Sequence, residues 1–160
     1  MALDRKQTIG IGAAILGLVV GGVVYVQSGH GMTLDGTWDC QTHWTCDLDG
    51  AAVPCAYTEK VTCTDGVSSS AGVLSIGAAQ WSEVAKGTYR VSDSAIDVRR
   101  SSITTTPKNE AARQFEREHL KGKRLGTVGV HEFRAHIVSF TETQLRTLSP
   151  EGRTTTCSRL

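Results

Sequence analysis

An uninterrupted apolar run over residues 8–26, TIGIGAAILGLVVGGVVYV, most constrains what this chain can fold into. The run contains no charged side chain. At about 1.5 Å per residue, roughly 19 helical residues cover nearly the whole ~30 Å hydrocarbon core of a bilayer. A helix on the surface of a soluble domain needs a polar face, and this run has none. The run therefore predicts a single transmembrane helix over 8–26.

The charges that flank the run predict its orientation. Arg5 and Lys6 precede it, whereas the next cation after it is Lys60. Because Lys and Arg gather on the cytoplasmic side of membrane helices, we expect residues 1–7 in the cytoplasm and the C-terminal part in the periplasm, beyond a bacterial inner membrane. The alternative is a cleaved signal peptide with its cleavage site at residues 26–28, but the run exceeds the 7–15 apolar residues usual for such peptides.

Glycines within the run indicate a helix–helix contact in the lipid bilayer. Gly17 and Gly21 form a GxxxG motif, and Gly10 lies on the same helical face. Small residues let two helix backbones approach closely enough to pack. The partner is another integral-membrane protein or a second copy of this chain, and the motif does not decide between them.

The remainder reads as a linker over 27–35 and one domain over 36–160. Roughly 125 residues are enough for a single hydrophobic core. The formal net charge of +1 argues against a nucleic-acid surface, which needs clustered cations. Thr, Ser, Gly and Val are plentiful, and this composition favours strands and turns.

Five cysteines lie on the expected periplasmic side, where an oxidising environment favours disulfides. Cys46 and Cys55 bracket a turn-rich loop containing Asp-Gly, so their pairing is the first choice. Cys157, near the end of the chain, is a candidate partner for Cys40. Cys63 is then left unpaired. A zinc site built from Cys40, His43 and Cys46 with Cys55 or Cys63 is an alternative, but this spacing matches no usual zinc ligand layout.

Alternating apolar and polar residues predict strands over most of the domain. The expected strands cover 36–46, 57–64, 67–76, 87–91, 95–103, 144–148 and 153–159. Residues 128–133 and 135–140 are expected to form two short strands or one bent strand. Residues 47–54 are expected to form a turn-rich loop, and residues 77–80 a looser stretch after the third strand. Short strands with frequent turns indicate an antiparallel β-barrel or sandwich, so the fold class is mainly β behind a transmembrane helix.

One amphipathic helix is expected among the strands. Thr106 is the expected cap, Pro107 the first helical residue and Gly122 the end. Ala111, Ala112, Phe115 and His119 share one face, which we expect to cover one end of the sheet.

The two ends of the domain carry a family resemblance. The domain opens on GTW-x-C over 36–40 and closes, over about 137–159, on a segment containing EGRTTTCSR. These segments resemble small bacterial lipocalin-like periplasmic domains, although the cysteines and the helix between them depart from that pattern. The resemblance implies an up-and-down β-barrel whose first and last strands meet, which would place Cys40 near Cys157. It implies no activity.

Signs of catalysis are missing from the sequence. It contains no nucleophile elbow, P-loop, dinucleotide fingerprint or haem attachment motif, and we expect no catalytic residue, cofactor or metal. His131 and His136 are five residues apart and would face opposite sides of one strand. Arg99 and Arg100 read as solvated surface. Trp38, Trp44 and Trp81 read as core residues, with the lining of a ligand pocket as the alternative.

These observations support two main functional hypotheses. The first is a non-catalytic accessory subunit that docks through its glycine-rich helix onto other subunits of an integral-membrane complex, of the energy-transducing or secretion type. The alternative is a membrane-tethered, lipocalin-like binder of a small apolar ligand. A thiol-active enzyme or hydrolase using Cys63 is a third hypothesis.

Overall fold

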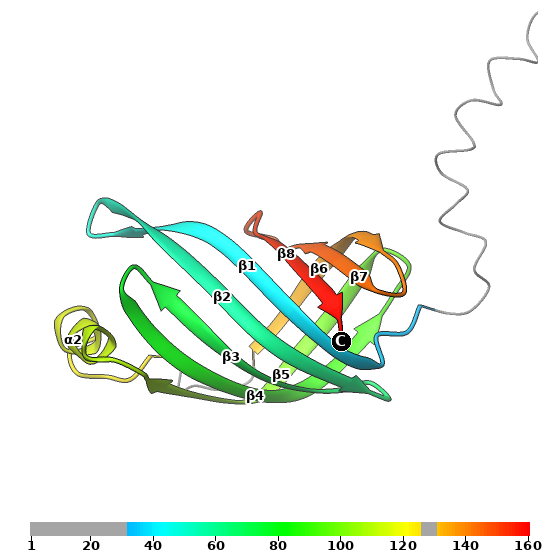
Figure 1. The fold of residues 1–160 in the computed structure, drawn as a ribbon, viewed down its shortest axis with the longest axis horizontal. Helices are drawn as coiled ribbons and strands as arrows, with labels where there is room; N and C mark the ends of the chain where they lie inside the picture. The colour runs from blue at the N-terminus through cyan, green and yellow to red at the C-terminus, as the bar shows by residue number, and fades with distance from the viewer. Residues whose placement is uncertain (1–31, 126–130) are drawn as a thin grey trace, which may run out of the picture. The chain divides into compact units, whose positions relative to one another are not determined.

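The described part of the chain, residues 32–125 and 131–160 of a computed structural model, folds into a closed barrel of eight antiparallel strands (Figure 1). The strands are β1 (Gly36–Leu48), β2 (Ala51–Thr64), β3 (Val67–Ile76), β4 (Ala79–Val91), β5 (Ala95–Pro107), β6 (His131–Phe140), β7 (Gln144–Leu148) and β8 (Thr154–Arg159). Each strand pairs with the next, and β8 pairs with β1. The expected mainly β, antiparallel architecture is confirmed, and it is the barrel, not the sandwich.

Two expected loops are instead strand. β2 begins at Ala51 because Asp49 and Gly50 alone make the turn, with φ of 53° and 83°, as a two-residue hairpin turn requires. β4 begins at Ala79, inside the stretch over 77–80 that was expected to be looser, and not at Gly87, where the next strand was predicted to begin. Its inward positions include Glu83 and Gly87, which interrupt the apolar alternation on which the prediction depended.

The single helix of the described residues, α2 (Glu110–His119), begins later than the sequence predicted. Asn109 is the N-cap, and its side-chain oxygen accepts a hydrogen bond from the Ala112 backbone N–H at 2.9 Å. Thr106 and Pro107 belong to β5, where they pair with β4. The helix also ends earlier than the expected Gly122, at His119 with Leu120 as the C-cap. Gly122 follows in the turn after the helix, where its N–H donates to the Glu116 carbonyl and its φ is +78°.

The apolar face of α2 covers one end of the sheet, as expected (Figure 1). Ala112 is fully buried against β4, and the ring of Phe115 meets that of Trp81 edge to face at 5.3 Å. The indole N–H of Trp81 donates to the Glu116 carboxylate at 3.0 Å, which satisfies two buried polar groups together. His119 on the same face lies 3.1 Å from Asp49 at the β1–β2 turn.

A β-bulge in β5 changes which residues face the interior. The β4–β5 register shifts between Lys86 and Gly87, so that Ser101 is the extra residue. Arg100 therefore faces inward before the bulge and Ile103 faces inward after it, although they are an odd number of positions apart, with two residues between them. Gly87 makes this possible, because a Cβ there would overlap the Arg99 carbonyl oxygen and lie 2.9 Å from the Arg100 Cα.

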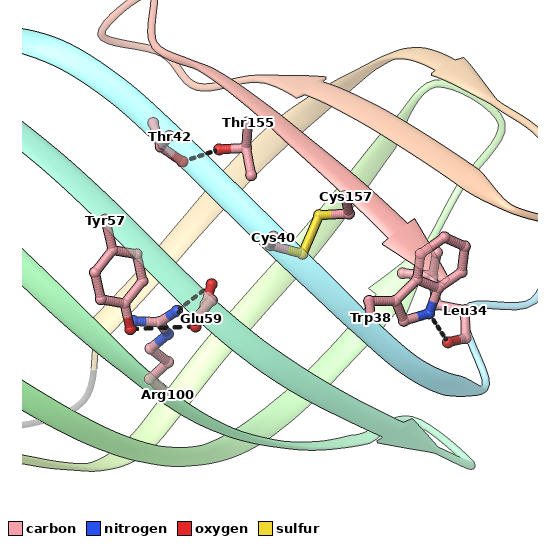
Figure 2. The surroundings of a disulfide bond; sticks show 9 residues. All are labelled: Leu34, Trp38, Cys40, Thr42, Tyr57, Glu59, Arg100, Thr155 and Cys157. Carbon is pink, nitrogen blue, oxygen red and sulfur yellow. Dashed lines mark hydrogen bonds and ion pairs between the residues drawn. A yellow bond between two sulfur atoms is a disulfide. The ribbon is translucent and has the colours of Figure 1, made fainter. Parts of the chain in front are cut away.

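Two disulfides join the pairs that the sequence favoured. Cys40 and Cys157 lie directly opposite each other where β1 meets β8 (Figure 2). Cys46 and Cys55 bridge the β1–β2 hairpin, and Cys63 is free and buried.

No helix in residues 32–125 and 131–160 is long and apolar enough to cross a membrane. The expected transmembrane helix over 8–26, with Gly10, Gly17 and Gly21, lies outside the described residues. It stays a prediction, as do the orientation and the partners inferred from it.

The two disulfides are expected to differ in their effect on stability. Cys40 and Cys157 are 117 residues apart, and Cys46 and Cys55 are 9 apart. Loop-closure entropy gives about 5 kcal/mol for the first bridge and about 2.5 kcal/mol for the second. Paired Cys→Ser variants compared by denaturant unfolding should show the larger loss for C40S/C157S. Equal losses, or the reverse order, would contradict the account of barrel closure.

Gly87→Ala should destabilise the barrel by about 1–3 kcal/mol, because the added methyl group has no room beside the bulge. Thr88→Ala, at the next and exposed position, is the matched control and should change stability by less than about 0.5 kcal/mol. Thermal unfolding of both variants measures this. A Gly87→Ala variant as stable as the control would mean that the bulge can relax at no cost.

Candidate functional site

The barrel encloses a cavity of about 300 Å³ that all eight strands line. This follows from alternation, because every second side chain of each strand faces the interior. The volume is at the lower end of the roughly 300–1,000 Å³ range of small-molecule sites. The cavity is the principal candidate site in the described residues.

The floor of the cavity is apolar and covered by the segment that precedes β1. Leu34 is buried there beside Trp38, whose indole N–H donates to the Leu34 carbonyl at 2.7 Å (Figure 2). The guanidinium of Arg159 lies 4.7 Å from the centroid of the Trp38 ring. Ile96 and Leu145 complete the buried cluster at this end. Trp38 is therefore both a core residue and part of the cavity wall.

A tyrosine–aspartate pair fixes the floor to the barrel. The Tyr89 hydroxyl donates to the Asp35 carboxylate at 2.8 Å, and the Asp65 backbone N–H donates to the same oxygen at 3.0 Å. Burial and this hydrogen bond raise the pKa of Tyr89 to about 12. The same hydrogen bond is the main reason that the pKa of Asp35 is lowered. Tyr89 therefore stays protonated and Asp35 stays ionised, and these are the two states that form the hydrogen bond.

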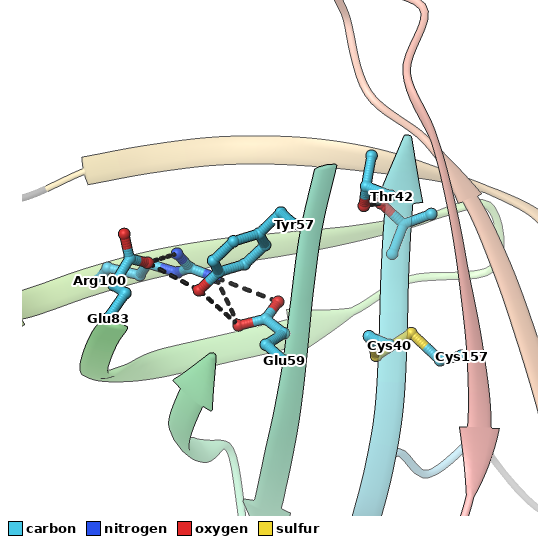
Figure 3. Close-up of polar contacts among 8 residues, drawn as sticks. Cys40, Thr42, Tyr57, Glu59, Glu83, Arg100 and Cys157 are labelled. Carbon is cyan, nitrogen blue, oxygen red and sulfur yellow. Dashed lines mark hydrogen bonds and ion pairs between the residues drawn. A yellow bond between two sulfur atoms is a disulfide. The ribbon is translucent and has the colours of Figure 1, made fainter. Parts of the chain in front are cut away.

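A layer of polar side chains crosses the middle of the barrel. Arg100 donates from Nη2 to the Glu59 carboxylate at 3.1 Å and from Nη1 to Glu83 Oε1 at 3.0 Å (Figure 3). The Tyr57 hydroxyl has one proton and donates it to the same Glu83 oxygen at 2.7 Å, and the hydroxyl oxygen also lies 3.2 Å from Glu59 Oε2. The exposed side-chain fractions are 19% for Arg100, 12% for Glu59 and 13% for Glu83. We call these four residues the polar layer.

Neighbouring strands provide the space that the polar layer needs. Gly72 on β3 lies directly opposite both Glu59 on β2 and Glu83 on β4. A Cβ at Gly72 would lie 2.8 Å from the Glu59 Cβ. The two carboxylates therefore flank a strand position without a side chain, and Arg100 reaches both from β5.

The polar layer holds its donors protonated. Burial opposes the charge on Arg100, but the nearby Glu59, Tyr57 and Glu83 outweigh it and raise the Arg100 pKa. Burial raises the Tyr57 pKa, and the charge of Glu59 raises it further. Tyr57 is therefore a neutral hydrogen-bond donor and Arg100 a permanent cation. Two carboxylates against one guanidinium give the layer a formal charge of −1.

The polar layer lies where the closed part of the barrel ends. Among the described residues, β1 pairs with β8 only as far as Thr42, and β5 pairs with β6 only as far as Arg100. Beyond these residues each strand has a described partner on one side only, β2 for β1 and β4 for β5. The layer therefore separates the apolar interior from this flared end.

Of the cysteines and tryptophans singled out from the sequence, some line the cavity and the others lie elsewhere in the barrel. Cys40, Cys157, Cys63 and Trp38 line the cavity. The other candidates do not: the Cys46–Cys55 bridge lies in the hairpin, Trp81 packs under α2, and Trp44 lies 4.7 Å from the Arg153 guanidinium.

Sequence reasoning missed the polar layer. Arg100 was expected to be solvated surface, and that expectation is wrong, because it faces inward and forms the two ion pairs. The expectation is right for Arg99, which is 61% exposed and pairs with Glu132. The alternation of Tyr57 and Glu59 with Val61 and Cys63 on one face of β2 was the available signal.

The geometry gives no support to a metal centre in the described residues. No group of three or more His, Cys, Asp or Glu side chains there is arranged around a common point. The zinc alternative loses Cys40, Cys46 and Cys55 to disulfides. His131 and His136 lie on an uninterrupted ladder with β5, so they face opposite sides of β6, as expected.

The described residues thus define an eight-stranded up-and-down β-barrel with an interior cavity. Comparison of the sequence with protein-family models and with curated proteins gives no match.

Cys63 should be inert in the folded protein. The residue is 6% exposed, and burial together with the charges of Asp35 and Glu59 raises the pKa of its thiol to about 11. About one molecule in a thousand then carries the reactive thiolate at pH 8. A disulfide-forming chromogenic thiol reagent should label no cysteine of the native protein within minutes, and one cysteine after unfolding without reductant. Rapid native labelling would contradict this environment and would favour the thiol-active hypothesis.

Proposed function

We propose that this protein is a membrane-tethered, lipocalin-like carrier or receptor that binds one small, largely apolar molecule inside its barrel. The cavity of about 300 Å³ is the observation that carries the proposal. A void of this size in a well-packed protein leaves side chains without contacts, and a ligand that fills it restores them.

The wall of the cavity suits such a ligand. Its lower part is built from Trp38, Val61, Ile96, Val98 and Leu145, which offer hydrocarbon and ring surface. Burying apolar ligand surface there is favourable by about 25 cal/mol per Å². The floor is closed and apolar, and the polar layer lies toward the opposite end, where α2 packs on β4, so the ligand would lie with its apolar part toward Trp38.

The subunit hypothesis depends on a different part of the chain. It rests on the glycine-rich run over 8–26, and nothing in the described residues specifically favours it. The two hypotheses are compatible, because a tethered binding domain can also dock onto other integral-membrane subunits. The cavity makes ligand binding the better supported activity.

Photolabelling of the full chain in lipid nanodiscs tests the proposal. The probe is an eight-carbon primary alcohol that carries a diazirine, and labelled peptides are located by mass spectrometry. Because location is read directly, labelling inside the barrel is separated from labelling of residues 8–26 by probe dissolved in lipid. We expect saturable labelling on β1, β2 and β5 at inward positions.

Ser70→Phe and Ser69→Phe form a matched pair of variants. Ser70 faces the cavity and Ser69, next to it on β3, is exposed on the outside. Phe at 70 fills the cavity and should reduce saturable barrel labelling at least tenfold, whereas Phe at 69 should leave it unchanged. The absence of saturable labelling in the wild-type barrel, or equal labelling of both variants, would overturn the proposal.

A further inference from the structure

We propose that the ligand of this cavity is an amphiphile with a cationic amine head group, which binds the Glu59 carboxylate. The inference rests on the proposed function and adds the chemical class of the ligand. It follows from the charge, the hydrogen-bonding capacity and the position of the polar layer.

Charge is the first argument. Arg100 is the only positive charge of the polar layer and pairs with both Glu59 and Glu83, so one of the two carboxylate charges is left uncompensated. An uncompensated charge that is nearly buried is costly, and a ligand cation removes this cost. Lys86 also borders the cavity, but it is exposed and occupies an outward position between Ala85 and Gly87. It therefore does not neutralise Glu59 from inside.

Glu59 also keeps room for another donor. A carboxylate has about four lone-pair positions. Glu59 accepts contacts from Arg100 Nη2 at 3.1 and 3.3 Å, and the Tyr57 hydroxyl oxygen lies 3.2 Å from it. Glu59 borders the cavity, whereas Glu83 does not. An ammonium entering the cavity thus meets Glu59, and Glu83 acts as a positioning residue through Arg100 and Tyr57.

The surroundings of Glu59 favour a cation over an anion. The rings of Tyr57 and Phe133 lie 5.9 and 5.7 Å from the Arg100 guanidinium, and aromatic rings attract cations at this level of the cavity. Arg100 is already engaged by two carboxylates, so an anionic head group would meet a layer of net negative charge. Burial is the main reason that the pKa of the Cys63 thiol is raised, and the negative charges of Asp35 and Glu59 raise it further.

Position is the last argument. The polar layer lies between the apolar floor and the flared end, so a molecule with its apolar chain toward Trp38 carries its head group to the level of Glu59. The wall of the cavity therefore complements a ligand that is apolar at one end and cationic at the other.

Competition against the photoreactive alcohol tests the inference in the same nanodiscs. The competitors are 1-octylamine, 1-octanol and octanoate, which share a chain and differ in the charge of the head group at neutral pH. In the wild type, we expect octylamine to displace the probe at a concentration at least tenfold lower than octanol. Octanoate should be the weakest competitor.

Three variants that each remove one negative charge test the role of Glu59, two inside the polar layer and one outside it as the control. Glu59→Gln and Glu83→Gln each leave one neutral ion pair with Arg100, and both should reduce the ratio of octylamine to octanol potency at least fivefold. Glu132→Gln removes an equal charge from an exposed site outside the cavity and should leave the ratio unchanged. Each competitor partitions into lipid to the same extent for every variant, so comparing the octylamine-to-octanol ratio between variants cancels this effect. If Glu59→Gln misfolds, Glu83→Gln still tests the inference.

The outcomes separate the inference from the proposed function. If octanol competes as well as octylamine, or octanoate competes best, the head-group inference fails while the barrel still binds ligands. If all three variants reduce the ratio equally, the preference reflects overall charge and the assignment to Glu59 fails. If the wild-type barrel is not labelled at all, the proposed function fails as well.

Discussion

The pairing of β8 with β1 is the contact on which the rest of the structure depends. It converts a curved sheet into a closed barrel, removes both sheet edges over that length and creates an interior. The Cys40–Cys157 bridge ties the two strands covalently, and the Thr42 and Thr155 hydroxyls lie 2.7 Å apart next to it (Figure 2). Without this closure, the inward side chains of β1 to β5 would form one face of an open sheet and would enclose no cavity.

Inside the closed barrel, apolar packing and charge have separate places. The floor is held by buried apolar side chains and by short hydrogen bonds to the segment before β1, such as that from Trp38 to Leu34. Half-way up, the same barrel admits Arg100 and two carboxylates, a group that apolar residues of similar volume could replace with little loss of stability. Because buried ion pairs often add little net stability, the polar layer fits the recognition role that we propose for it.

The sequence allowed much of the fold to be predicted, because alternation and turn residues are local signals. β3 and β7 have the expected bounds, and Cys46 and Cys55 are paired across their Asp-Gly turn. The errors occur where tertiary contacts override local pattern. Asn109 caps α2 because its side chain also bonds to the Gln80 N–H of β4 and to the carbonyl of Ala78, just before β4. The candidate site was harder to predict, because a bulge opposite Gly87 determines which way Arg100 points, and neighbouring letters do not reveal it.

The most direct test of the account is to locate a bound amphiphile by NMR, using octylammonium and the full chain in nanodiscs with labelled Ile, Leu and Val methyl groups. The account predicts intermolecular NOEs from the ligand chain to Val61, Ile96 and Val98, which face the interior. NOEs confined to Val84 and Val138, which are exposed on the outside, would show that the ligand does not enter the barrel and would contradict the central claim.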